Sequence, residues 1–288
     1  MKMRSSTWLQ VCLYFSLSAG LTHNLSAAVA SPANGGDVPA TVRSTDDVSR
    51  KLNSSSVAKT DVEVLERARA ANDDVYSSLQ SFVCNEEINR FKGNLNGQSA
   101  HALDTVTAKL SFERGIEQYT DVHQNNRMRP GMSSLPGAWS EGEFGTLLLQ
   151  TQQLLTTQNV QFDTLADVKG EQAAIYHFDV VEADSPWDLT VSGHHYRLPF
   201  RTNVWIAVNT GEILKIDRIT LIIPSETRIS EIQWGITLGH VALNGKSWLL
   251  PDAGTYAVLY NESRHREWNL ISFTGYQRYG AQTALKFE

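Results

Sequence analysis

Apolar and polar side chains alternate with a period of two along most of the chain after residue 80, which is typical of β-strands that bury one face. The clearest run, residues 106–113, is followed by an Arg-Gly pair that predicts a turn into a partner strand at 116–122. Asn-Thr-Gly at 209–211 predicts a hairpin turn. Other strand-like runs lie at 83–88, 174–180, 204–208, 213–219, 230–236, 256–260, 268–273 and 281–287. Consecutive strands with short connections predict an antiparallel meander.

Two segments have helical periodicity instead. Thr60 and Glu63 have the spacing of a capping box, and apolar residues at helical spacing follow as far as Leu79. Residues 143–156 contain leucines among glutamines, after a loop rich in Gly, Pro and Ser at 129–142. A long meander curls strongly and needs a cover for its apolar face. We therefore predict an α+β fold: a strongly curved antiparallel β-meander, or half-barrel, covered by one or two helices.

The N-terminus has the organisation of a cleavable signal peptide. Lys2 and Arg4 form a positive n-region, residues 8–21 are mostly apolar, and Ala28-Val29-Ala30 offers a cleavage site before Ser31. The apolar run is shorter than the ~20 residues that span a bilayer, and an uncleaved anchor is the alternative. The predicted organisation is a signal peptide at 1–30, a flexible turn-rich linker at 31–58 and one half-barrel domain at 59–288. The expected location is therefore periplasmic or extracellular, for a protein that does not span the membrane.

The net charge bears on the kind of partner, and the cysteine content bears on whether a disulfide can form. Cleavage would remove two positive charges and no acid, so the net charge would change from −6 to −8. An acidic balance disfavours nucleic acid as a partner, because that partner needs a basic surface. Cys12 would leave with the signal peptide, and Cys84 would remain as a thiol with no partner in the chain. We predict that Cys84 is buried and unpaired in a strand.

Candidate chemical groups do not form a recognisable catalytic or metal-binding motif. His194 and His195 are adjacent in a predicted polar loop, and neighbouring side chains of an extended segment point to opposite faces. Glu86 and Glu87 are interpreted as surface charge, because a general acid–base pair needs carboxyl groups that face one substrate. We expect no catalysis, no bound metal and no cofactor.

Several stretches resemble the periplasmic lipoprotein-carrier fold of LolA-, LolB- and RseB-like proteins. Residues 204–216 read V-W-I-A-V-N-T-G-E-I-L-K-I, which is similar to a strand–turn–strand of these proteins. Residues 246–251 and 273–281 resemble exported bacterial proteins of unassigned function that share this fold. The resemblance covers residues 60–288 and implies an incomplete barrel wrapped around helices.

The resemblance and the unpartnered apolar strand faces together predict an exported, non-enzymatic binding protein for an apolar or lipidic ligand, such as a lipid or acyl chain. The candidate lining residues of its pocket are Tyr176, Phe178, Trp205, Ile232 and Trp234. The same aromatic residues could instead form plain core. Two other functions stay open: an envelope protein-interaction or stress-sensor domain on the same fold, and a hydrolase whose site is assembled from scattered residues.

Overall fold

The computed structural model describes residues 9–10, 62–71, 79, 82–94, 99–113, 115–261 and 265–278. The predicted cleavage site, the linker at 31–58 and the strand-like run at 281–287 lie outside the described residues. No helix in the described part of the chain is long and apolar enough to cross a membrane.

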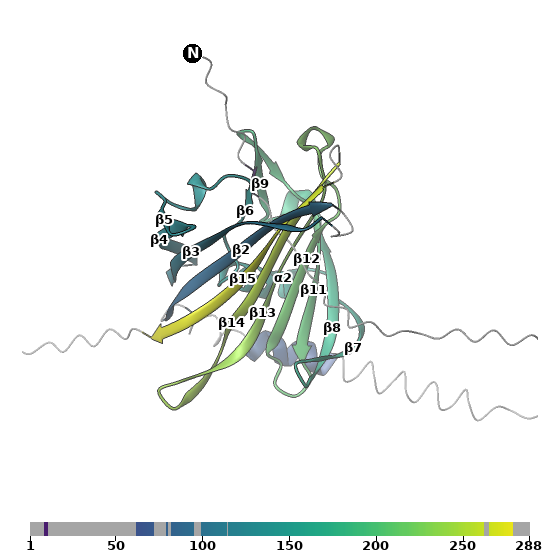
Figure 1. Ribbon diagram of the computed structural model, residues 1–288. Coiled ribbons are helices and arrows are strands. Elements are labelled where there is room, and N and C mark those ends of the chain that lie inside the picture. Colours follow the sequence, from purple (N-terminus) through teal and green to yellow (C-terminus); the bar gives the residue numbers. More distant parts are fainter. Residues whose placement is uncertain are drawn as a thin grey trace, which may run out of the picture.

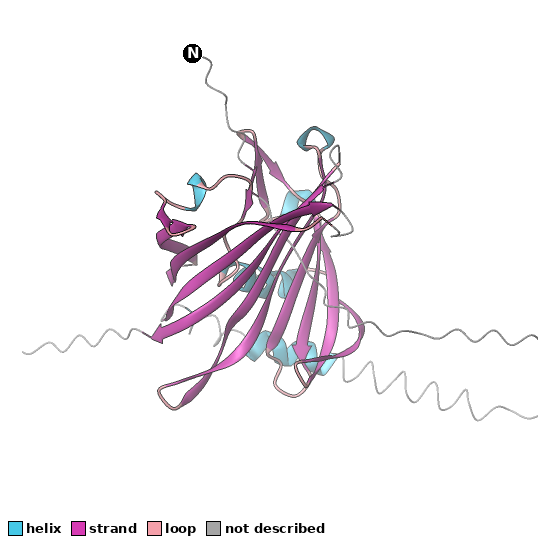
Figure 2. Cartoon of the chain, viewed as in Figure 1, coloured by secondary structure: helices cyan, strands magenta, loops and turns pink. Residues whose placement is uncertain are grey.

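One large antiparallel sheet dominates the molecule (Figures 1 and 2). Its strands are β2 (Phe82–Asn94), β3 (His101–Glu113), β4 (Ile116–Gln124), β5 (Arg127–Met128), β7 (Gln161–Val168), β8 (Glu171–Val180), β11 (Phe200–Ala207), β12 (Ile213–Thr220), β13 (Ile229–Leu243), β14 (Lys246–Tyr260) and β15 (His265–Arg278). They lie in the order β5-β4-β3-β2-β15-β14-β13-β12-β11-β8-β7. The predicted α+β class with a curved antiparallel sheet is confirmed.

The order of strands departs from a simple meander at one place. β15, the last described strand, pairs with β2 along most of its length, for example Ile271 with Ile88. Two meanders, β2–β5 and β7–β15, are thereby joined into one sheet. Register shifts occur in several strand pairs, including one between Thr237 and Leu238 where β13 pairs with β14. Such bulges increase local twist and bend the strands.

Two helices and a long loop cover one face of this sheet, which we call the inner face (Figure 1). The helix predicted at 143–156 is confirmed as α2 (Thr146–Thr157), which buries mainly leucines. From the inner face of β12, the Arg218 guanidinium donates to Gln150 Oε1 of α2 at 2.7 Å. Residues 62–71 form the other helix, and its Arg69 donates to the Leu155 carbonyl of α2 at 2.9 Å. The helices are therefore linked to each other as well as to the sheet.

A smaller sheet lies at one end of the molecule. It has the order β10-β9-β1-β6, with β1 at Leu9–Gln10, β6 at Ala138–Trp139, β9 at Asp188–Val191 and β10 at His194–Arg197. Three short 3-10 helices lie at Met132–Ser134, Glu182–Asp184 and Ser225–Thr227. His194 and His195, predicted to lie in a loop, belong to β10 and are exposed.

Candidate ligand-binding site

The five predicted lining residues fall on two different faces of the sheet. Tyr176, Phe178, Ile232 and Trp234 lie on the inner face, where each is buried in the main core cluster. Trp205 lies on the opposite, outer face, packed against a separate small cluster of Ala173, Ala207 and Leu214. The structure therefore brings four of these residues together in the core and places the fifth elsewhere.

The outer face holds a pocket of about 560 Å³, within the range that accommodates small ligands. Its floor consists of small residues on the two middle strands, including Gly235 of β13 and Ala253 of β14. Larger side chains, Trp268 and Leu270, line it from the neighbouring strand β15. The register of the strands brings these residues together. Gly235 of β13 pairs with Thr255 of β14, and Ala253 of β14 pairs with Ser272 of β15. Small side chains beside large ones leave the hollow, which we call the outer-face pocket.

A buried ion pair from β12 forms part of the wall of this pocket. Lys215 Nζ lies 2.8 Å from Asp217 Oδ2, and the two side chains keep only 20% and 12% of their exposure. The same ammonium lies 4.1 Å from the centre of the Trp205 ring. Burial lowers the pKa of Lys215 and raises the pKa of Asp217. The 2.8 Å contact between the two groups opposes the effect of burial on each of them, because opposite charges at this distance favour both charged forms.

A second ion pair closes one end of the pocket. Lys169 lies in the turn between β7 and β8, and its ammonium contacts the Asp252 carboxylate on β14. Three strands separate β8 from β14 in the sheet, so this contact links the β7–β8 turn to a distant strand across the outer face. Both side chains are about half exposed, at 55% and 48%.

On the inner face, a carboxylate from the sheet caps α2. The Glu117 carboxylate on β4 accepts the backbone N–H groups of Phe144, Gly145 and Thr146 at 3.1, 2.8 and 3.1 Å. A negative charge at this position also complements the positive end of the helix dipole. The contact fixes where α2 begins relative to the sheet.

Two further glutamates are buried beside this cap. Glu143 accepts a hydrogen bond from Trp234 Nε1 at 3.0 Å, and burial together with the Glu117 charge raises its pKa to about 8. Glu86, on β2, is 2% exposed, and neither carboxylate oxygen has a hydrogen-bond partner among the described residues. Burial and the charge of Glu143 raise the pKa of Glu86 well above its ordinary value. A raised pKa favours the neutral acid in this apolar surrounding.

The interpretation of Glu86 as surface charge is therefore wrong, whereas Glu87 is exposed as predicted. Glu86 shares its face of β2 with Cys84 and Ile88, both buried. Strand alternation from Phe82 onward contained this signal, because every second side chain there is on the apolar side. Cys84 is confirmed as buried and free, and burial raises the pKa of its thiol.

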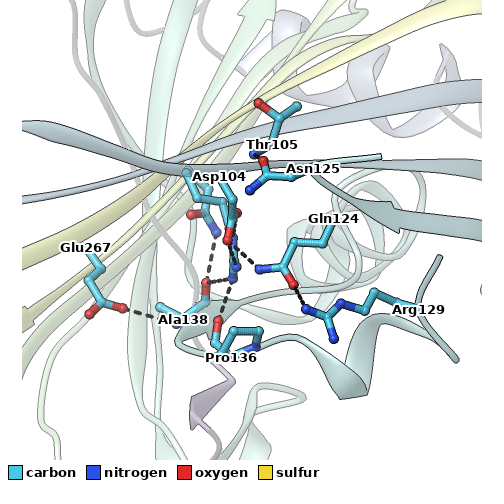
Figure 3. Close-up of polar contacts among 10 residues, drawn as sticks. Asp104, Thr105, Gln124, Asn125, Arg129, Pro136, Ala138 and Glu267 are labelled. Carbon is cyan, nitrogen blue, oxygen red and sulfur yellow. Dashed lines mark hydrogen bonds and ion pairs between the residues drawn. The ribbon is translucent and has the colours of Figure 1, made fainter. Parts of the chain in front are cut away.

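A polar network holds the loop before α2 against the sheet (Figure 3). Arg90 donates two hydrogen bonds to the Asp104 carboxylate, each 2.6 Å long, and a third to the Pro136 carbonyl at 2.7 Å. Gln124 Nε2 also donates to Asp104. Burial would raise the pKa of Asp104, but the hydrogen bonds from Arg90 and Gln124 lower it overall. The network is a structural support rather than an open site.

The histidines do not form a relay of the kind a hydrolase uses. His195 Nδ1 lies 3.1 Å from Thr190 Oγ1 and 3.2 Å from Asp188 Oδ2, so both contacts involve the same ring nitrogen. His177 Nδ1 contacts Asp163 at 2.7 Å. Among the described residues, no group of three His, Cys, Asp or Glu side chains is arranged to hold a metal ion.

The chain resembles several solved structures at low scores. A putative outer membrane lipoprotein-sorting domain from Vibrio parahaemolyticus is 10% identical with a TM-score of 0.37, and the match covers 77% of this chain and 95% of that one. A DUF1329 family protein from Desulfovibrio piger is 11% identical with a TM-score of 0.37, covering 78% and 94%. Lipoprotein LppX from Mycobacterium tuberculosis is 9% identical with a TM-score of 0.27, covering 76% and 98%.

A scan against models of protein families and a search of curated proteins found no match. Likeness at these scores gives no information about ligand or activity, so the function proposed below depends on the geometry of the chain itself.

Proposed function

We propose that this protein is an exported, non-enzymatic binding protein for an apolar or lipidic ligand, and that the outer-face pocket holds that ligand. The observation that carries the proposal is the 560 Å³ hollow, whose lining includes Ala253, Trp268 and Leu270 beside the two ion pairs. Apolar surface that stays exposed costs about 25 cal/mol per Å², so a hollow of this composition favours an apolar occupant. In this proposal Tyr176, Phe178, Ile232 and Trp234 are core residues, and Trp205 supports the pocket from its side.

The affinity of an acyl chain for this pocket can be estimated from the methylene groups that it would bury. Each buried methylene contributes about 0.8 kcal/mol, so an acyl segment of about ten methylenes would contribute about 8 kcal/mol before the cost of association. A gain of about 8 kcal/mol alone corresponds to a dissociation constant of about 1 μM, and the association cost of about 4 kcal/mol or more shifts the expected constant toward the millimolar range.

Titration of the purified protein with a pyrene-labelled long-chain methyl ester tests the proposal. Leu270→Asp should abolish binding, because it places a charge in the pocket at a site that is already 40% exposed. Leu103→Asp is the matched control: Leu103 is 41% exposed, lies on β3 and is not part of the pocket lining. Saturable binding lost only in Leu270→Asp supports the proposal. Absence of saturable binding to the wild type, or equal loss in both variants, contradicts it.

A second candidate function, an envelope protein-interaction domain, is favoured by a different observation. Val181, Leu221 and Ile222 are exposed large aliphatic residues at one end of the large sheet. The strand ends are neighbours, because the Leu221 N–H donates to the Pro199 carbonyl at 3.0 Å. If the protein does not bind the ester probe, these exposed residues favour the interaction-domain function, because an exposed apolar patch is typical of a protein-binding surface.

A further inference from the structure

We propose that the Lys215–Asp217 pair makes the outer-face pocket selective for uncharged lipids, such as esters and alcohols, and against ionised fatty acids. The inference rests on the proposed function, because it concerns the same pocket. Among the described residues that line the pocket, the charged side chains are Lys169, Lys215, Asp217 and Asp252. They form two pairs of opposite charge, so the wall offers an incoming carboxylate no cation that is not already engaged.

The cation deepest in the wall is held from two sides. The Lys215 ammonium contacts Asp217 at 2.8 Å and lies over the Trp205 ring at 4.1 Å. A ligand carboxylate that contacted this ammonium would place a second negative charge beside Asp217, so two carboxylates would share one cation. One negative charge would then be buried in the pocket without neutralisation, which is strongly unfavourable.

The pair at the mouth does not change this conclusion. Lys169 and Asp252 are about half exposed, and ion pairs of such exposure are weak and screened by salt. An ionised headgroup could stay in water near this mouth, but it would gain little there. An uncharged headgroup brings no second negative charge and can enter together with its chain.

The experiment compares the methyl ester and the free acid of one pyrene-labelled fatty acid at pH 7, where the acid is ionised and Lys215 holds its proton. The wild type should bind the ester at least about tenfold more tightly than the acid. Asp217→Asn keeps the size of the side chain but removes its negative charge, so a ligand carboxylate at Lys215 would no longer be a second anion beside the ammonium. This variant should gain affinity for the acid and reduce the ester-to-acid ratio at least about fivefold, with the ester affinity changed less.

The matched control is Asp179→Asn. Asp179 pairs with Arg201 at 2.6 Å on the outer face, and neither residue lines the pocket. This control makes the same charge change and should leave the ratio as in the wild type.

Each outcome separates the two proposals. If the wild type binds neither probe, the proposed function fails, and this inference fails with it. If the wild type binds both probes equally, or if Asp217→Asn and Asp179→Asn shift the ratio alike, the selectivity inference is overturned while the binding function stands. Circular dichroism checks that the variants fold; if Asp217→Asn does not, the ester-to-acid ratio of the wild type decides alone.

Discussion

Replacing Glu143 with glutamine should reduce the loss of stability that the protein undergoes between pH 5 and 8. Glu143 is 1% exposed, and burial and the nearby Glu117 charge raise its pKa from the ordinary 4.5 to about 8. Below pH 4.5 both the folded and the unfolded protein hold this proton. Between pH 4.5 and 8 only the folded protein holds it, so the free energy of unfolding falls as the pH rises, and above pH 8 this contribution is fully lost.

The magnitude follows from the shift of the pKa. One unit corresponds to about 1.36 kcal/mol, so a shift from 4.5 to about 8 corresponds to a loss of about 5 kcal/mol across the window. Glutamine cannot ionise, and its side-chain oxygen can still accept the hydrogen bond from Trp234 Nε1. The Glu143→Gln variant should therefore lose several kcal/mol less than the wild type between pH 5 and 8.

Urea denaturation followed by circular dichroism at half-unit pH steps measures this difference. Glu87→Gln is the control, because Glu87 lies on the exposed face of β2. The control should follow the wild-type curve to within about 0.5 kcal/mol at every pH. If the Glu143→Gln curve runs parallel to the wild-type curve, the assignment of a buried neutral acid at this position is refuted.

Three further predictions concern other parts of the chain. N-terminal sequencing of the exported protein should begin at Ser31, and recovery of intact Met1 would contradict cleavage. Cys84 in the native protein should react with a thiol reagent orders of magnitude more slowly than in urea, because the thiol is buried and its pKa is raised; rapid native labelling would contradict this. Gly211→Ala should destabilise the protein by at least about 1 kcal/mol more than Gly170→Ala in the same urea assay. Both glycines have positive φ, but a Cβ at Gly211 would lie 2.8 Å from the Arg67 backbone, whereas a Cβ at Gly170 meets no atom within 4 Å; equal losses would show that this close approach is unimportant.

Most strands of the large sheet and the second helix could be predicted because each leaves a local signal, whereas β7, β9 and β10 were not predicted. Alternation gave residues 106–113 and the turn at 209–211, and the leucine spacing gave α2 to within three residues at its start. The pairing of β2 with β15 leaves no such signal, since it joins segments more than 170 residues apart. The periodicity of a strand indicates which of its side chains share a face, but it does not indicate which other strand pairs with it.

The pocket could not be predicted for the same reason. Gly235 and Ala253 become a common floor only through the register of β13 and β14, which a bulge interrupts between Thr237 and Leu238. The prediction of lining residues followed aromatic content, and aromatic side chains such as Tyr176 and Trp234 pack just as well into a core. An inward-facing glutamate, by contrast, was readable from the alternation of β2.

The pairing of β2 with β15 also sets the order in which the chain can complete its fold. Residues 82–94 lie near the start of the described sheet, yet one of their two neighbouring strands, 265–278, comes at its end. During synthesis, strands β2–β5 and strands β7–β14 stay separate until β15 has been made. Until then each group has an unpaired edge strand. Contacts of such long sequence separation slow folding. A sheet built this way is completed only after residues 265–278 have been made.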